Sequence, residues 1–268
     1  MPDVLQLGDH TLSLGGVTHV MGVINLSPDS KNTHTIAGSV DEAVAMADRY
    51  RHWGATIIDL GGQSSHYDNP TIEAADEIIR VVPAIEALSA EGHPVAIDTW
   101  KADVAQAAVE SGAVIINDTG GLAEPAMRDV VRRTGVVAVA VHIEGANPHA
   151  VGEVTISEDK AQITAEGFRV LLEDLARDGI TNVILDPGIA LNYRGDYEAY
   201  SRMQLEVIAG SDHLRTLAKP VLIPIPRKRD GHRLAVYMGL ALEHEADIMR
   251  VHDVAMACDL VRLFGRTP

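Results

Sequence analysis

The chain has 268 residues, of which 46% are hydrophobic and 22% charged, as in globular proteins that bury a full core. A net charge of −16 and an aromatic content of 4% argue against nucleic-acid partners, which need a basic face or aromatic stacking platforms. No apolar stretch approaches the ~20 residues of a membrane-spanning helix, and the first residues lack the basic and apolar regions that we would expect of a signal peptide. The single cysteine, Cys258, stands in an apolar helix-like stretch, where we expect a buried, inert thiol. Together these features predict a cytoplasmic protein without disulfides, nucleic acid or membrane partners.

The first predicted element is a hairpin over residues 4–14, where apolar and polar side chains alternate around Gly8 and Asp9. Short apolar runs then alternate with helical patterns along the rest of the chain. The apolar runs are 21–24, 56–58, 95–97, 114–116, 139–141, 182–185, 220–223 and 248–252. The helical patterns are 40–52, 72–90, 101–111, 124–133, 158–177, 197–208, 231–245 and 253–264. Strands and helices in this order predict parallel βαβ units.

Eight such units favour a single α/β domain over residues 1–268, folded as a (β/α)₈ TIM barrel with an N-terminal β-hairpin that closes the N-terminal end. An open, doubly wound sheet is the alternative architecture. Both folds gather the carboxyl ends of their strands on one side, where barrel enzymes place their active sites.

Polar residues stand where the apolar runs end, and a barrel would bring them together at this rim. They are Asn25, Asp59, Asp98, Asn117, His142, Asp186 and the pair Arg250 and His252. Residues two apart on a strand point the same way, so Arg250 and His252 could hold a phosphate or pyrophosphate together. A salt-bridged arginine beside an ordinary strand-end histidine would give the same pattern.

Asp98, Asn117, Asp186 and Lys228 offer two carboxylates, one amide and one ammonium group. Such a set could recognise a flat heterocycle with N–H donors on one edge and a carbonyl on another. Each residue alone could equally be a strand-end cap or a supporting contact. The convergence of all four at one rim favours a binding site.

Six segments resemble, in order, the signatures of the dihydropteroate synthase family of pterin-binding barrels: MGVINLSPDS, GATIIDLGGQSS, AIDTWKADVAQAAVESGAVIINDTGG, VILDPGIA, PRK and ADIMRVHDV. The resemblance spans about Met21 to Val254. It implies a TIM barrel, a homodimer, and a pterin deep in the mouth. In this family a pterin-methyl pyrophosphate loses pyrophosphate, and the amine of p-aminobenzoate attacks the resulting cation.

Carried over residue by residue, the resemblance assigns Asp98, Asn117, Asp186 and Lys228 to the pterin. It assigns Asn25, Arg250 and His252 to the pyrophosphate, with Mg²⁺ beside Asn25. The residues expected to act in catalysis are Asp98, Asp186, Lys228, Arg250 and His252, and Ser65, His66 and Arg227 are expected to contact the pterin or folate.

The departures from the family pattern lie in the loops beside the second substrate. The family's Phe-Ser-Asp-Gly-Gly after Asp-Ser is replaced by Lys31-Asn32-Thr33-His34-Thr35, and its Ser-Thr-Arg-Pro by Ser64-Ser65-His66-Tyr67. Its Gly-Phe-Gly-Lys becomes Ala190-Leu191-Asn192-Tyr193, and its Ser-Arg-Lys-Ser becomes Pro226-Arg227-Lys228-Arg229. The pterin pocket is therefore retained while the aniline pocket is rewritten.

Three functions follow from this pattern. The leading one joins the pterin methylene to an amine such as p-aminobenzoate. The first alternative uses a folate, such as methylenetetrahydrofolate, for one-carbon transfer or cyclisation, with contacts from His66, Tyr67, His142 or Arg229. The second alternative is a pterin-binding protein without catalysis. The remaining histidines, His10, His52, His93, His213, His232 and His244, lack metal-like spacing and are expected at the surface rather than in a zinc site.

Overall fold

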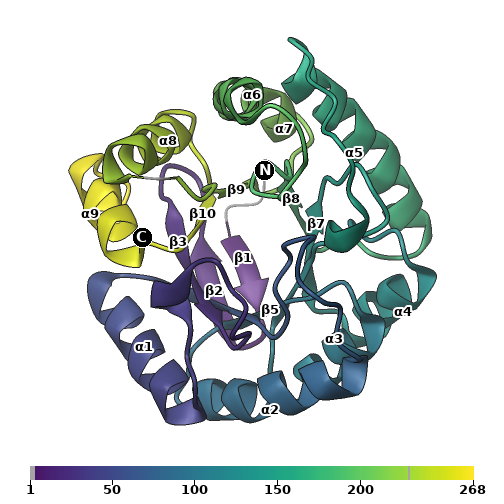
Figure 1. The fold of residues 1–268 in the computed structure, drawn as a ribbon, viewed down its shortest axis with the longest axis vertical. Helices are drawn as coiled ribbons and strands as arrows, with labels where there is room; N and C mark the ends of the chain where they lie inside the picture. The colour runs from purple at the N-terminus through teal and green to yellow at the C-terminus, as the bar shows by residue number, and fades with distance from the viewer. Residues whose placement is uncertain (1–3, 229) are drawn as a thin grey trace.

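The computed structural model describes residues 4–228 and 230–268, and within these ranges eight parallel strands form a barrel ringed by helices (Figure 1). The barrel strands are β3 (His19–Asn25), β4 (Ile57–Gly61), β5 (Val95–Asp98), β6 (Ile115–Asp118), β7 (Val137–Val141), β8 (Val183–Asp186), β9 (Leu222–Pro224) and β10 (Ile248–Val251). The helices are α1 (Val40–Trp53), α2 (Ala74–Ala90), α3 (Ala102–Glu110), α4 (Pro125–Thr134), α5 (Lys160–Arg177), α6 (Tyr197–Ala209), α7 (Asp212–Arg215), α8 (Gly231–Glu243) and α9 (Val254–Leu263). The short α7 is an addition to the elements that the sequence predicts.

The sheet runs in the order β8-β7-β6-β5-β4-β3-β10-β9, and its two outer strands meet. The backbone N–H of Leu185 donates to the carbonyl of Pro220 at 2.9 Å, and Leu185 forms a parallel bridge with Val221. This contact joins β8 to β9 and closes the sheet. The TIM barrel is therefore confirmed over the open sheet.

Strand alternation divides the core into two parts. One set of side chains faces the helices, including Ile58, Leu60 and Ile97. The other set fills the barrel interior, including Met21 and Ile57. Parallel strands covered on both sides need apolar residues at consecutive positions, which explains the continuous runs in the sequence.

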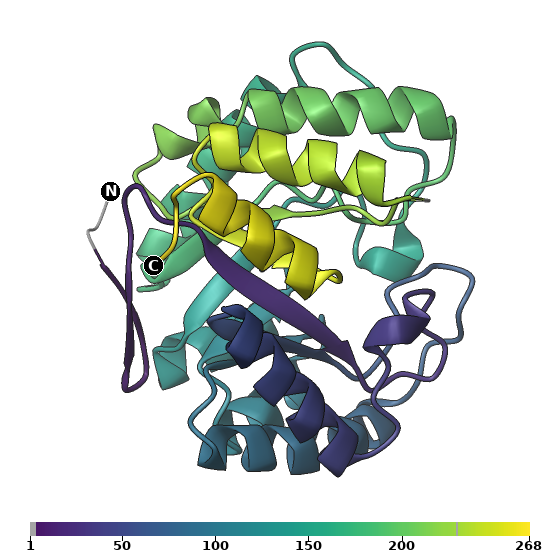
Figure 2. The ribbon, with the colours of Figure 1, turned by 90° about the vertical axis from the view of Figure 1, so that its left-hand side faces the viewer.

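The predicted hairpin is confirmed as β1 (Val4–Leu7) and β2 (His10–Ser13). Its inward leucines, Leu5, Leu7 and Leu12, join the interior cluster of the barrel. Figure 2 shows the hairpin at one end of the barrel and the 3₁₀ helix η1 (Thr33–Thr35) at the other. The hairpin thus closes the N-terminal end and leaves the opposite mouth to the loops that follow the strands.

Cys258 is buried, as expected, and burial raises the pKa of its thiol to about 11. Among the described residues, no helix combines the length and the apolar character needed to cross a membrane.

Candidate active site

The floor of the mouth is made of polar side chains that each stand two residues after an inward apolar one. Asp59 follows Ile57 in this way, and Asp186 follows Ile184. The same spacing relates Ala96 to Asp98, Ile115 to Asn117 and Ile248 to Arg250. Because side chains alternate along a strand, one register places these polar groups in a single layer above the apolar interior.

Arg250 holds this layer together through two carboxylates. Its Nε donates to Asp59 Oδ2 at 2.7 Å, and its Nη2 donates to Asp98 Oδ2 at 2.5 Å. Asn117 Nδ2 lies 3.4 Å from both oxygens of Asp59, which is fully buried. Burial alone would lower the pKa of Arg250, but Asp59 and Asp98 outweigh it and raise that pKa, so the guanidinium remains charged.

Two carboxyl groups of the floor have raised pKa values. Desolvation raises the pKa of Asp98 to about 7 despite the opposing charge of Arg250. Desolvation likewise raises the pKa of Asp186 to about 7. The backbone N–H of Gly188, which donates to Asp186 Oδ1 at 2.7 Å, favours the ionised form and partly offsets this rise. Both groups are thus balanced between the neutral and ionised forms near pH 7, a common property of functional carboxylates.

The buried amide of Asn117 has one free acceptor. Among the described residues, no donor reaches Asn117 Oδ1. A buried carbonyl oxygen without a partner is costly, and a ligand N–H group would satisfy it. Asn117, Asp98 and Asp186 line one cavity of about 40 Å³ with Ser65 and Arg250.

A second cavity, of about 90 Å³, continues outward from the first and shares Ser65, Asp98 and Arg250 with it. Asn25 and His252 also line it, so the pair Arg250 and His252 does face one space. Burial, followed by the charges of Arg250 and other cations, lowers the pKa of His252 to about 3. His252 is therefore neutral at pH 7 and can donate a hydrogen bond without adding charge.

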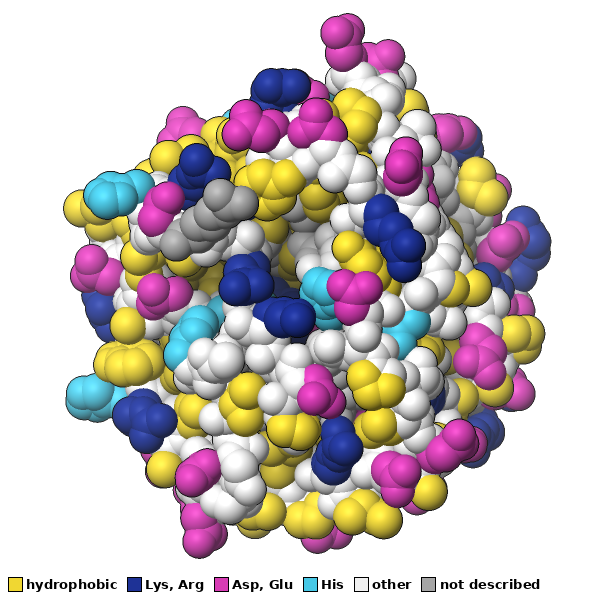
Figure 3. All heavy atoms as spheres, viewed as in Figure 1, with side chains coloured by type: hydrophobic (Ala, Val, Ile, Leu, Met, Phe, Trp, Pro, Cys, Tyr) yellow, Lys and Arg dark blue, Asp and Glu magenta, His cyan; other side chains and the backbone are white. Residues whose placement is uncertain are grey.

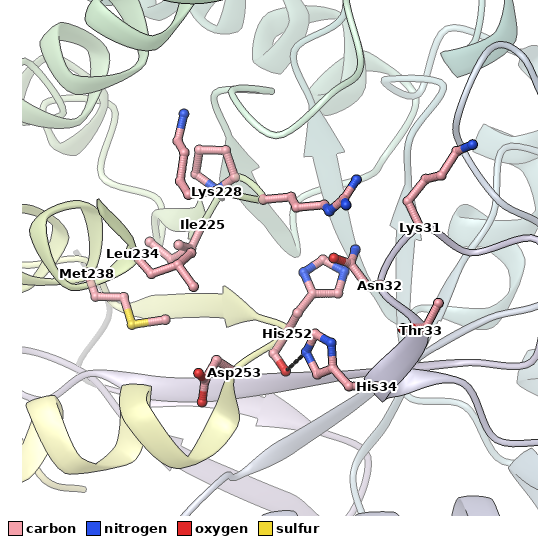
Figure 4. Close-up of a pocket in the computed structure, with 12 residues that line it drawn as sticks. Lys31, Asn32, Thr33, His34, Ile225, Lys228, Leu234, Met238, His252 and Asp253 are labelled. Carbon is pink, nitrogen blue, oxygen red and sulfur yellow. Dashed lines mark hydrogen bonds between the residues drawn. The ribbon is translucent and has the colours of Figure 1, made fainter. Parts of the chain in front are cut away.

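Lys228 stands apart from the three residues with which the sequence groups it. Its ammonium donates to Gln204 Oε1 at 2.6 Å and to Ser201 Oγ at 3.2 Å, and it lies 4.2 Å from the centre of the Tyr237 ring. In Figure 4 its side chain points away from His252. Desolvation lowers its pKa to about 8. The structure thus brings together Asp98, Asn117 and Asp186, with Arg250 rather than Lys228 as their cation.

The outer residues of the mouth come from the loops. His66 and Arg227 line the second cavity beside Ser65. The ring of His66 packs on Tyr67, with the centroids 4.8 Å apart, and Tyr67 in turn lies 4.6 Å below the guanidinium of Arg194. Arg229, the fourth candidate from the sequence, lies outside the described residues.

Two expectations about histidines are wrong. His142 ends an apolar run, but the inward position belongs to Val141, so the ring of His142 packs on Phe168 of α5 with the centroids 6.0 Å apart. His93 is 4% exposed rather than at the surface, and its Nε2 lies 3.5 Å from Asp48. Asp48, Glu91 and His93 lie close together, but Arg51 already pairs with Asp48.

One histidine that the sequence did not single out joins two loops. His149, in the 3₁₀ helix η2 (Pro148–Ala150), binds the carbonyl of Ser64 at 2.8 Å through Nε2 and the hydroxyl of Thr71 at 2.8 Å through Nδ1. Its ring packs on Trp100 at 5.1 Å. In the sequence, the position of His149 directly after Pro148 in a long loop is the only feature that indicates this contact between loops.

Comparison with known proteins matches residues 21–262 to the family model described as pterin binding enzyme. The dihydropteroate synthase of Bacillus subtilis is 30% identical over 270 residues, covering 97% of this chain and 92% of that protein. A probable bifunctional folylpolyglutamate synthase/dihydropteroate synthase of Halobacterium salinarum is 32% identical, and the match covers 94% of this chain but 32% of that longer protein.

Solved structures give the same result. The dihydropteroate synthase of Xanthomonas albilineans with 4-aminobenzoic acid superposes with a TM-score of 0.84 at 27% identity, covering 99% of this chain and 98% of that one. The Burkholderia cenocepacia enzyme complexed with 7,8-dihydropteroate gives a TM-score of 0.82 at 28% identity, covering 98% and 96%. Because the family model matches residues 21–262, which is most of this chain, the chain belongs to the family of pterin-binding enzymes.

Proposed function

We propose that the protein is a dihydropteroate synthase-type transferase. It joins the methylene carbon of 6-hydroxymethyl-7,8-dihydropterin pyrophosphate to an amine such as p-aminobenzoate. The Bacillus subtilis relative, which covers 97% of this chain, is a dihydropteroate synthase, and two structural neighbours hold 4-aminobenzoic acid and 7,8-dihydropteroate. The observation in this chain that best supports the proposal is the buried Asn117 amide beside two carboxyl groups with raised pKa values.

The floor of the mouth suits the pterin ring. The ring presents amino and ring N–H donors on one edge, and Asn117 Oδ1 and the carboxyl oxygens of Asp98 and Asp186 are the acceptors that line the cavity. Partly ionised carboxyl groups in this desolvated place stabilise the positive charge that develops when the C–O bond to pyrophosphate breaks. The amine nitrogen then forms the new C–N bond and loses one proton to the solvent or the departing pyrophosphate.

The outward side of the floor suits the leaving group. Arg250 supplies a permanent charge, and neutral His252 supplies an N–H donor in the same cavity. In this assignment Arg250 acts on both halves of the substrate. It contacts the pyrophosphate directly, and it holds Asp98, which would bind the pterin. Lys228 contacts the substrate only if it leaves Gln204, and this movement is part of the proposal.

Asn25 has the properties of a Mg²⁺ ligand. Its Nδ2 donates to Thr35 Oγ1 at 2.7 Å, which leaves Oδ1 for a cation at the edge of the same cavity. Mg²⁺ usually keeps several waters and takes most of its other ligands from substrate phosphates and a few protein oxygens, so Asn25 would supply one ligand beside the pyrophosphate. The bound ion would neutralise charge on the pyrophosphate. We further propose that the protein is a cytoplasmic homodimer, in keeping with its family and its single buried thiol.

Pyrophosphate release from the dihydropterin pyrophosphate, measured with Mg²⁺ and with or without p-aminobenzoate, tests the proposal. We expect release that depends on the amine, and an Asp186→Ala variant at least about 100-fold slower. Binding of tetrahydrofolates without any pyrophosphate release would instead support the one-carbon alternative. Pterin binding without turnover of either kind would leave a non-catalytic role.

A further inference from the structure

Three side chains with metal-binding atoms meet on the outside of the barrel, where α1 packs against α2 (Figure 1). Asp48 belongs to α1, Glu91 is the C-cap of α2, and His93 stands two residues before β5. We call these three residues the outer cluster. Because β5 begins after His93 and reaches the mouth only at Asp98, the outer cluster lies toward the end of the barrel opposite the candidate active site.

The buried member of the outer cluster is His93, whose Nε2 has no hydrogen-bond partner among the described residues. The residue is 4% exposed, and its position is fixed because its backbone N–H donates to the carbonyl of Leu88 at 3.0 Å. Asp48 Oδ1 lies 3.5 Å from Nε2, which is longer than a normal hydrogen bond. A buried nitrogen without a partner is costly, and a ligand that binds it would remove this cost.

The spacing of the ligand atoms suits a tetrahedral metal ion. Zinc lies about 2.0–2.2 Å from histidine nitrogens and carboxylate oxygens, so two of its ligands stand roughly 3.4 Å apart. The distance of 3.5 Å between His93 Nε2 and Asp48 Oδ1 is close to this value. The ligand atoms of the outer cluster all lie within 4.8 Å of one another, and the side chain of Glu91 is exposed and can move closer.

The types of ligand atom indicate which ion would bind. An imidazole nitrogen suits zinc and other transition metals, whereas Mg²⁺ and Ca²⁺ prefer oxygen ligands. Burial, followed by the charge of Arg51, lowers the pKa of His93, so its ring is neutral at pH 7, as a metal ligand must be. Two carboxylates balance the charge of a divalent ion, and water can take the fourth position.

Arg51 is the cation that contacts the outer cluster in the structure. Its Nη2 donates to Asp48 Oδ1 at 2.5 Å, and its Nη1 donates to the carbonyl of Glu91 at 3.2 Å. The side chains of Arg51 and Asp48 are 52% and 45% exposed, so water screens this ion pair and it contributes little to stability. A divalent ion held by three ligands can therefore displace the guanidinium from Asp48.

We propose that Asp48, Glu91 and His93 form a zinc site that ties α1 to the turn between α2 and β5. Arg51 competes with the ion for Asp48 and is not itself a ligand. Sequence spacing does not reveal this site, because Asp48 is far from the other two ligands in the chain. Zinc bound only by the folded state would stabilise the fold, and the inference does not depend on the reaction in the mouth.

Zinc titration of the metal-free protein, in competition with a chromophoric chelator, tests the inference. We expect a bound zinc ion that excess Mg²⁺ does not displace. His93→Gln removes the buried ligand and Glu91→Gln the exposed one, and each should weaken binding at least about tenfold. Arg51→Met should instead tighten binding a few fold, because it frees Asp48. His52→Gln, the matched control, removes an exposed histidine beside Arg51 on α1 and should leave the affinity unchanged.

Histidines also line the mouth, where His66 and His252 share the second cavity, and Figure 3 shows cyan side chains near the centre of the face in view. Zinc should therefore raise the Tm of the wild type and of His252→Gln, but not that of His93→Gln. Unchanged affinity in either His93→Gln or Glu91→Gln overturns the inference, and so does binding that His252→Gln abolishes. Weaker binding in Arg51→Met also overturns it, because the arginine would then support the ion rather than compete with it.

Discussion

The floor of the barrel mouth is made of strand ends, whereas its rim is made of loops from distant parts of the chain. The floor residues Asp59, Asp98 and Arg250 are fixed by strand register and are joined by hydrogen bonds of 2.5–2.7 Å. The rim residues are held by contacts between loops, such as those of His149 with the carbonyl of Ser64 and the hydroxyl of Thr71. The floor is therefore expected to resist change in position, while the rim can change its sequence without altering the barrel.

This difference has a functional consequence. In the proposed function the floor would surround the pterin part of the substrate, and Asp98, Asn117 and Asp186 match the family pattern. The rim would surround the second substrate, and there the sequence departs from the family pattern, for example at Lys31, His66 and Tyr67. Specificity can thus change in the loops while the chemistry of the floor is preserved.

The largest effect is expected when the floor loses its central cation. Arg250→Met leaves the buried Asp59 and the partly buried Asp98 without their cation, which should lower the free energy of unfolding by about 3–5 kcal/mol. Arg132→Met, which breaks an exposed pair with Asp129, should cost less than about 1 kcal/mol. Urea unfolding measures both, and similar losses in the two variants would contradict the central role of Arg250.

A smaller effect, of opposite sign, is expected at Asp186. Folding raises the pKa of this carboxyl group, so between about pH 4 and 7 the folded state binds more protons than the unfolded state. Its contribution to stability is therefore lost as the pH rises through this window. Asp186→Asn removes this pH dependence. Between pH 5 and pH 8 the wild type should therefore lose about 1–3 kcal/mol more of its free energy of unfolding than the variant does. The kcat/KM of the variant should fall about 100-fold.

Thermal unfolding at the two pH values checks this expectation. The exposed Asp129→Asn variant serves as the control and should show no pH-dependent difference from the wild type. A loss of stability in Asp186→Asn that is the same at both pH values would mean that the carboxylate is structural. The predicted result would mean that the floor keeps an unfavourable charge for the sake of function.

The sequence predicts the floor better than the rim for a physical reason. Apolar runs define the strands, and two-residue alternation places Asp98, Asn117 and Asp186 in one layer. The same rule, applied fully, would have turned His142 outward, because Val141 occupies the inward position. Strand patterns alone therefore predict which residues face the mouth.

The direction of a loop side chain has no such rule. Lys228 stands directly after the strand β9 and its Pro-rich continuation, yet its ammonium is directed by Gln204 of α6 and Tyr237 of α8. These partners come from separate helices whose packing a local pattern does not specify. The partner of Asp59 in β4 is likewise hidden from a local pattern, because Arg250 lies 191 positions away in the sequence.

The smallest effect on stability is expected at the rim. There the KM for the amine and the KM for the dihydropterin pyrophosphate should respond differently to one substitution. His149→Phe keeps an aromatic ring on Trp100 but removes the bonds to the Ser64 carbonyl and the Thr71 hydroxyl. We expect a loss of about 1 kcal/mol in the free energy of unfolding, since both bonds are partly exposed to solvent. The loop that carries Ser65 and His66 then moves more freely, so the KM for the amine should rise a few fold while the KM for the dihydropterin pyrophosphate stays unchanged.

Thr71→Val, which removes one of the two bonds, should give a smaller rise in the KM for the amine. An increase in the KM for the dihydropterin pyrophosphate in either variant would show that floor and rim are coupled.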